Sequence, residues 1–155
     1  MEWSGRDKKM ERDMNRYVLD TSVVVKWFTE YNEDDIDAAI SLREDILEGR
    51  ISIVIPDLLF YELSNALRYN SAFDRKDVKD ALQSIMDMEF DVREVNDEVL
   101  NNAVSIAFKY NVTVYDAYFL SLAIKENIPY MTADYKFIKR LKRLKNIILL
   151  SDYLS

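Results

Sequence analysis

The feature that most constrains the fold is an alternation of short apolar runs with longer segments of helical character along almost the whole chain. The apolar runs predict strands at residues 17–19, 51–55, 91–95, 130–132 and 146–150. The other segments predict helices at residues 22–29, 34–48, 57–70, 114–126 and 134–143, and two more that begin after the caps Asp74 and Asn96. This alternation is typical of an α/β domain around a mainly parallel sheet.

The chain of 155 residues has the length of a single domain with one hydrophobic core. Residues 1–15 carry charges of both signs without an apolar pattern, so we expect a charged N-terminal extension that is loosely ordered or disordered. A partner-binding segment around Trp3 is the alternative for this region. The folded domain is predicted to span residues 16–155.

The chain contains no cysteine and no histidine, which limits the chemistry available to it. Without cysteine there is no disulfide, no thiolate nucleophile and no cysteine-ligated metal site. Without histidine the most common general base and the most common metal ligand are also missing. Catalysis would therefore depend on carboxylates, hydroxyls, lysines or a metal ion bound by oxygen atoms, for which Mg²⁺ and Mn²⁺ are the usual choices.

The net charge of -7 argues against a protein that binds nucleic acid through its overall charge, although it leaves local basic patches open. No apolar run approaches the roughly 18–20 residues needed to span a bilayer. The first residues also lack the apolar region of a secretory signal. These features predict a cytoplasmic protein.

Two acidic residues lie where predicted strands end. Asp20 directly follows the first strand, and Asp134 falls two residues after the strand at residues 130–132. In a parallel sheet, ligand sites gather in the crevice at the carboxyl ends of the strands. We therefore expect both side chains to project into this crevice.

Two further acids lie on the apolar sides of predicted helices. The apolar neighbours are Leu59, Leu63, Ala66 and Leu67 for Glu62, and Phe119, Leu120 and Ala123 for Asp116. Taken singly, a helix cap explains Asp134, and a salt bridge at the edge of the core explains Glu62 or Asp116. Taken together, converging carboxylates repel one another, and a divalent cation relieves that repulsion. A metal centre is the interpretation we favour.

The acids occur in segments that resemble a known family. YVLDTSVVVKWF (residues 17–28), IPDLLFYELSNAL (55–67) and TVYDAYFLSLAIKENIPYMTAD (113–134) resemble a PIN-domain protein, and most of all the VapC-type toxins of toxin–antitoxin pairs. The resemblance covers nearly the whole chain from Arg16 onward. It implies a three-layer α/β/α sandwich, in agreement with the alternation of strands and helices.

The resemblance also implies a function and a site. The protein is expected to be a metal-dependent endoribonuclease that uses Mg²⁺ or Mn²⁺, with an RNA substrate, a cognate antitoxin protein and a homodimeric assembly. Ser22 matches the family's hydroxyl after the first acid, and Thr132 is expected to support the site in the same way. The family's catalytic and metal-binding acids correspond to Asp20, Glu62, Asp116 and Asp134.

A basic stretch near the C-terminus contains no acid and is a candidate for RNA contact. The predicted contact residues are Lys136, Lys139, Arg140 and Arg143, and Lys142 and Lys145 belong to the same stretch. The alternative is an ordinary solvated helix end, because cations near a helix C-terminus are favoured by the helix dipole.

Three other functions compete with the nuclease. A receiver-like phospho-acceptor domain would need a second acid beside Asp20, where Thr21 stands instead. A phosphatase of the Asp-x-Asp type would need an acid where Ser22 stands. A PIN-like module that only binds RNA or protein is the more serious alternative, although the presence of all four acids argues against it.

Overall fold

The computed structural model describes residues 15–29, 35–141 and 144–154. Within these ranges a sheet of five parallel strands runs through the centre, in the order β3–β2–β1–β4–β5. The strands are β1 (Arg16–Leu19), β2 (Ser52–Pro56), β3 (Asp91–Arg93), β4 (Tyr130–Thr132) and β5 (Ile147–Leu149). The predicted parallel sheet is confirmed.

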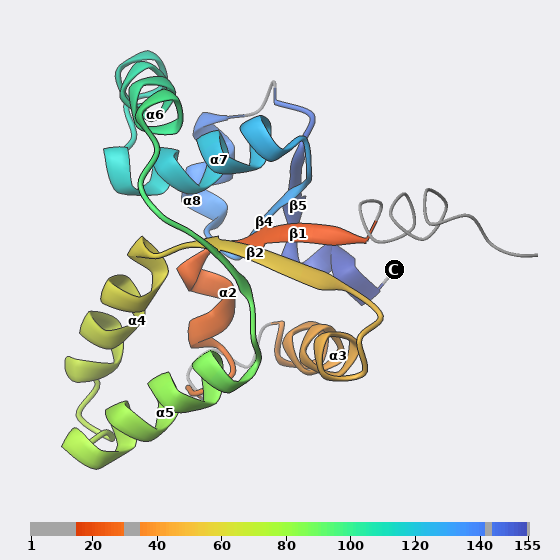
Figure 1. The fold of residues 1–155 in the computed structure, drawn as a ribbon, viewed down its shortest axis with the longest axis vertical. Helices are drawn as coiled ribbons and strands as arrows, with labels where there is room; N and C mark the ends of the chain where they lie inside the picture. Colours follow the sequence, from red (N-terminus) through yellow and green to blue (C-terminus); the bar gives the residue numbers. More distant parts are fainter. Residues whose placement is uncertain (1–14, 30–34, 142–143, 155) are drawn as a thin grey trace, which may run out of the picture.

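Helices cover both faces of this sheet. They are α2 (Thr21–Val25), α3 (Ile36–Leu47), α4 (Leu58–Arg68), α5 (Arg75–Asp87), α6 (Asp97–Tyr110), α7 (Val114–Glu126) and α8 (Tyr135–Arg140), followed by the 3₁₀ helix η1 (Leu150–Leu154). In Figure 1, α6 and α7 lie above the strands, and α3, α4 and α5 lie below them. The fold is the predicted three-layer α/β/α sandwich. No helix in the described ranges is long and apolar enough to cross a membrane.

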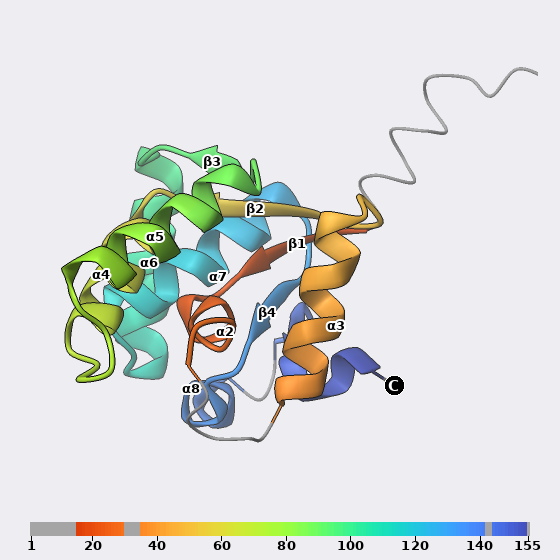
Figure 2. The same ribbon diagram turned by 90° about the horizontal axis from the view of Figure 1, so that it is seen from below.

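The strand order reverses at the centre of the sheet. The chain runs outward from β1 through β2 to β3, and then returns to place β4 on the other side of β1. Such a reversal leaves a crevice at the carboxyl ends of the two central strands, because their following segments diverge. Figure 2 shows β1 and β4 leading into α2 and α8 at this edge. Asp20 and Asp134 begin those segments.

Several predicted elements differ at their ends. The helix expected at residues 22–29 ends at Val25 and continues as turns. The helix expected from residue 34 begins at Ile36, because Asp35 takes a left-handed conformation with φ 71°. The helix expected at residues 134–143 spans only Tyr135–Arg140, and Arg143 and Lys142 lie outside the described residues. The helix predicted at residues 114–126 and the strand predicted at 130–132 are confirmed at both ends, and the other predicted strands and the helix at 57–70 differ by one or two residues at an end. Residues 1–14 of the predicted extension also lie outside the described part.

The core lies on both faces of the central strands. Val18 and Leu19 of β1 and Val54 and Ile55 of β2 are fully buried, as expected for a parallel sheet covered on both sides. Helix α7 is buried from Ala117 to Ala123. The predicted apolar side of α4 is only partly correct: Leu59, Leu63 and Leu67 are buried, whereas Ala66 is exposed.

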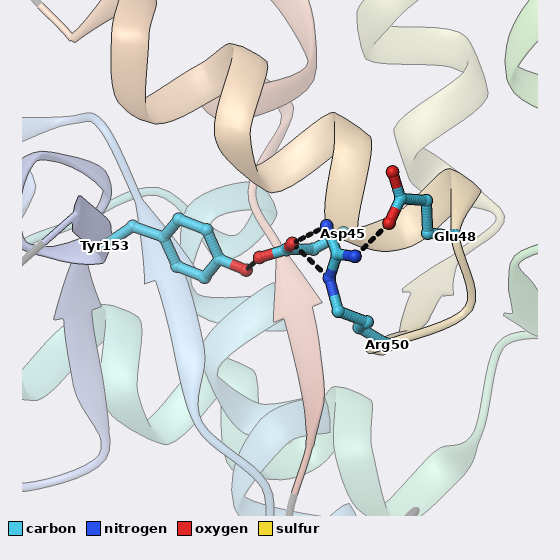
Figure 3. A network of polar contacts seen from close by, with 4 residues as sticks. All are labelled: Asp45, Glu48, Arg50 and Tyr153. Atoms are coloured by element: carbon cyan, nitrogen blue, oxygen red, sulfur yellow. Dashed lines mark hydrogen bonds and ion pairs between the residues drawn. The ribbon is translucent and has the colours of Figure 1, made fainter.

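A polar network fastens the end of the chain to α3 (Figure 3). Asp45 of α3 accepts hydrogen bonds from the Tyr153 hydroxyl of η1 and from the guanidinium of Arg50, whose Nε lies 2.7 Å from Asp45 Oδ1. Arg50 also pairs with Glu48. Gly49 ends α3 with φ 73°, a left-handed conformation that only glycine adopts without steric cost, and so turns Arg50 back toward Asp45.

Candidate active site

The four predicted acids come from four different elements that meet at the carboxyl edge of the sheet. Asp20 and Asp134 are the N-cap residues of α2 and α8, Glu62 lies in α4, and Asp116 lies in the first turn of α7. Asp20 has only 7% of its surface exposed, and the other three are half-buried. The sequence thus places each acid correctly on a strand end or helix.

Hydroxyl groups join the ends of β1 and β4. Oδ2 of Asp20 accepts hydrogen bonds from the Ser22 backbone N–H at 3.2 Å and from the Thr132 hydroxyl at 3.4 Å. The Ser22 hydroxyl accepts from the Ala133 backbone N–H at 3.0 Å and lies 3.3 Å from the Thr132 hydroxyl. Thr132 in turn accepts from the Asp134 backbone N–H at 3.0 Å. Ser22 and Thr132 therefore fix the loops that carry Asp20 and Asp134.

Glu62 is fixed by a neighbour of Asp20. The Thr21 hydroxyl donates to Oε1 of Glu62 at 2.8 Å, which joins the first residue of α2 to the middle of α4. Thr21 is itself buried, with 8% of its surface exposed. This bond holds the Glu62 carboxylate on the side of α4 that faces Asp20.

Asp116 and Asp134 are tied to helix starts. The Thr113 hydroxyl caps α7 by accepting from the Asp116 backbone N–H at 3.1 Å, and a hydrogen bond from Thr113 also lowers the pKa of the Asp116 carboxyl against the effect of burial. Oδ1 of Asp134 accepts from the Phe137 backbone N–H at 3.1 Å and caps α8. The helix-cap explanation for Asp134 is therefore correct, and it uses one of the two carboxylate oxygens.

The carboxylates share an environment that disfavours their charged forms. Burial raises the pKa of Asp20, and the charge of Asp134 adds to this effect, while hydrogen bonds from Ser22 and Tyr130 oppose it. Burial also raises the pKa of Glu62 and of Asp116, and in both cases the charge of Asp20 raises it further. The charge of Asp116 also raises the pKa of Glu62, and the charge of Asp134 raises that of Asp116. The four charges are thus close enough to interact.

No cation balances this negative charge among the described residues. None of the ion pairs that they form includes one of the four acids. In the described ranges no three acidic side chains are near enough to one another to hold a metal ion as they stand. The donor set still fits a hard divalent cation, because it offers only oxygen ligands and its members repel one another in the absence of positive charge.

A hollow of about 320 Å³ opens beside two of the acids. Asp116 and Asp134 line it together with two of the predicted RNA-contact residues, Lys136 and Arg140. Lys139 is exposed and is not among the lining residues. Among the described residues, the basic stretch therefore divides into cations that line the hollow with the acids, Lys136 and Arg140, and cations that do not, Lys139 and Lys145.

Three supporting residues were not predicted. Nothing in the sequence pattern predicts the contact of Thr21 with Glu62. Thr113 could have been predicted, because a threonine three residues before Asp116 is a typical helix cap. Tyr130 was assigned only to a strand. Its buried hydroxyl interacts with Asp20 and Thr132, and burial, followed by the charge of Asp20, raises its own pKa. The polar end of a buried tyrosine is its only signal in the sequence.

Known structures share this fold. A protein from Pyrobaculum aerophilum, PAE2754, is 22% identical over 90% of this chain and 92% of its own, with a TM-score of 0.65. VapBC2 from Rickettsia felis, solved bound to a DNA fragment from its promoter, is 20% identical over 86% and 96%, with a TM-score of 0.60. VapC20 from Mycobacterium tuberculosis, described as a toxin that cleaves the sarcin–ricin loop, is 13% identical over 79% and 93%, with a TM-score of 0.63.

At these identities the structural matches establish the fold alone. No curated protein sequence matches the chain. The family model described as PIN domain matches residues 17–144, a range that includes all four acids, their supporting hydroxyls and the hollow. This chain therefore belongs to the PIN domain family.

Proposed function

We propose that this protein is a metal-dependent endoribonuclease and the toxin of a type II toxin–antitoxin pair. One observation carries the proposal: four carboxylates whose charges influence one another lie around the strand-order reversal, and none of them takes part in an ion pair among the described residues. Buried like charges without a counter-ion cost free energy, so a protein that keeps them has a use for a cation there. Membership of the PIN domain family supports nuclease activity.

Asp20, Asp116 and Asp134 are the residues that would hold Mg²⁺ or Mn²⁺, with Glu62 placing a second ion or the attacking water. A divalent ion in this position supplies positive charge that stabilises a phosphodiester under attack and makes water more acidic. Ser22 and Thr132 hold the Asp20 carboxylate and the Asp134 backbone in place through the hydrogen bonds between the β1 and β4 ends. Thr21 does the same for Glu62.

Carboxylates are the main candidates for proton transfer at this site, since the chain has no histidine. The raised pKa of Glu62 brings this side chain closer to the range in which it can accept a proton from water. Attack by water does not use the RNA 2′-hydroxyl. By resemblance to the family, we expect products with 5′-phosphate and 3′-hydroxyl ends.

Two protein partners belong to the proposal. An antitoxin is supported by the similarity in fold to a structure described as a toxin–antitoxin complex from Klebsiella pneumoniae, with a TM-score of 0.63. A homodimer is supported by exposed aromatic side chains on α4, α6 and the start of α7: Tyr61, Phe108 and Tyr115 are 75%, 87% and 62% exposed, and Tyr61 and Tyr115 line a common hollow. Exposed aromatic residues in such number are typical of protein interfaces.

The experiment that tests the function maps cleavage sites in total RNA, with and without Mg²⁺ or Mn²⁺, for wild type and Asp20→Asn. We expect new 5′-phosphate ends only with wild-type protein and metal. Asn caps a helix as well as Asp does, so α2 remains intact in the variant. Wild-type cleavage by Asp20→Asn would show that the site is wrong.

The competing function is an inactive PIN-like module that binds RNA or protein. It predicts no cleavage under any metal condition and no stabilisation by metal. The retention of all four acids favours the enzyme, because an inactive site has no need of four mutually repelling carboxylates.

A further inference from the structure

The hollow beside Asp116 and Asp134 has walls of opposite charge. Its acids come from the start of α7 and from the N-cap of α8, and its cations, Lys136 and Arg140, come from α8 itself. Lys136 and Arg140 are four residues apart on a helix and therefore share one face. Like charges at this spacing repel each other, so without an anion they destabilise the helix slightly.

The two walls do not neutralise each other. Among the described residues, neither Lys136 nor Arg140 takes part in an ion pair, although both line the same hollow as two carboxylates. No cation is among the groups that shift the pKa of Asp116, which agrees with this separation.

Arg140 is held in place by the backbone. Its Nη1 donates to the carbonyl oxygen of Asn111, which ends α6 in a left-handed conformation with φ 54°. This bond connects α8 to the segment between α6 and α7 and places the guanidinium at the hollow. Guanidinium has five donors, so one bond to a carbonyl leaves donors for a phosphate.

We infer that Lys136 and Arg140 bind an RNA phosphate next to the scissile one, with the hollow as its site. The inference rests on the proposed nuclease function and specifies how the same site takes its substrate. A phosphodiester chain offers negative charges in succession, so one phosphate can meet the acids through a divalent cation while its neighbour meets the cations directly. RNA bound in this way would balance the charges of the acidic wall and of the basic wall at once.

Lys139 provides a matched control. It lies in the same helix and carries the same charge, but it does not line the hollow. Lys136→Ala, Arg140→Ala and Lys139→Ala each remove one positive charge from α8. Any difference between them therefore reports position and not net charge.

The test measures binding of a short fluorescently labelled single-stranded RNA across a range of salt concentrations, in an Asp20→Asn background with Mg²⁺. Each phosphate contact contributes about 0.7 to the slope of log affinity against log salt for single strands. We expect Lys136→Ala and Arg140→Ala each to weaken binding and to reduce the slope by about 0.7, and Lys139→Ala to leave it nearly unchanged. Arg140→Lys should retain the slope, because it keeps the charge.

Equal slopes for all three alanine variants, or no RNA binding at low salt, would overturn the inference. Should Arg140→Ala unfold through loss of the Asn111 contact, Lys136→Ala and Arg140→Lys still decide the question. Failure of the proposed function gives a different result, which does not depend on the slopes. Either Asp20→Asn still cleaves the RNA, or the wild type never cleaves it. If Asp20→Asn cleaves the RNA, the slopes are measured with EDTA in place of Mg²⁺.

Discussion

Asp20 and Asp45 have the same side chain but opposite electrostatic surroundings. At Asp45, hydrogen bonds from Tyr153 and Arg50 lower the pKa, because both groups stabilise the charged carboxylate (Figure 3). At Asp20, burial raises the pKa and the charge of Asp134 adds to it. The first arrangement fastens the C-terminal 3₁₀ helix to α3, whereas the second leaves an unbalanced charge at the carboxyl edge of the sheet.

The pKa shifts distinguish acids that increase the free energy of unfolding from acids that decrease it. An acid whose charge is balanced by its neighbours contributes to stability, and its pKa falls. An acid whose pKa is raised makes the folded protein less stable at neutral pH, and a bound cation reverses this. Raised values at Asp20, Glu62 and Asp116 in one crevice therefore mark a functional site with a physical reason.

The largest effect is expected on cleavage, from a residue that positions the acid cluster. Ser22→Ala removes the hydroxyl that accepts from the Ala133 backbone and contacts Thr132. Loss of a group that orients metal-binding residues typically costs about 10–100-fold, so we expect a loss of cleavage in this range together with weaker metal affinity. Ser64→Ala is the control, because the Ser64 hydroxyl donates to the Phe60 carbonyl oxygen of its own helix. Equal losses in both variants would contradict the role of Ser22.

The next effect is expected on stability, from the opposite region. Asp45→Asn removes the charge that Tyr153 and Arg50 stabilise. The charge-assisted bond from Tyr153 becomes a neutral one, and we expect the free energy of unfolding to fall by about 1 kcal/mol, which corresponds to about 2–4 °C in Tm. Thermal denaturation measures the change. Cleavage should stay at the wild-type rate, and a loss of activity would mean that the two regions are not independent.

The same substitution at Asp20 should change the Tm in the opposite direction. Asp20→Asn in the absence of metal removes a buried charge that repels its neighbours and keeps an equally good helix cap. We expect Tm to rise while cleavage is lost. A lower Tm in metal-free buffer would show that the Asp20 charge stabilises the fold, as the Asp45 charge does, and would contradict the prediction.

The smallest expected effect is the pH dependence of the changes in Tm caused by Asp20→Asn and Asp45→Asn. Because the pKa of folded Asp20 lies above its ordinary value of 3.8, the stability gained by Asp20→Asn should be absent at acid pH and appear as pH rises above this value. Because the pKa of folded Asp45 lies below 3.8, the stability lost in Asp45→Asn should be full above 3.8 and disappear as pH falls below it. Tm measured at several pH values tests both, and parallel curves for the two variants would contradict them.

Much of the site could be predicted because its residues occupy special places in a regular pattern. Asp20 and Asp134 follow apolar strands, and a parallel sheet brings the carboxyl ends of such strands to one edge. Glu62 interrupts the apolar side of a helix, which a solvated acid would not do. The order of strands was not available from the pattern, since alternation of strands and helices is the same for any arrangement of the parallel strands.

Contacts between residues far apart in the chain could not be predicted from the sequence pattern. Thr21 and Glu62 are 41 positions apart, and Asp45 and Tyr153 are 108 apart, so neither pair leaves a periodic signal. The short α8 was predicted too long, because the basic stretch has helical spacing beyond the point where the helix ends at Arg140. Local spacing predicts secondary structure, but only packing decides which side chains meet.

The most direct test of the central claim is the change in Tm on addition of Mn²⁺ to wild type, Asp116→Asn and Asp45→Asn. An ion at one hundred times its Kd stabilises the folded protein by about 2.7 kcal/mol. We predict a rise in Tm for wild type and for Asp45→Asn, and none for Asp116→Asn. No rise in wild type, or an equal rise in Asp116→Asn, would contradict the claim that these carboxylates form a metal site.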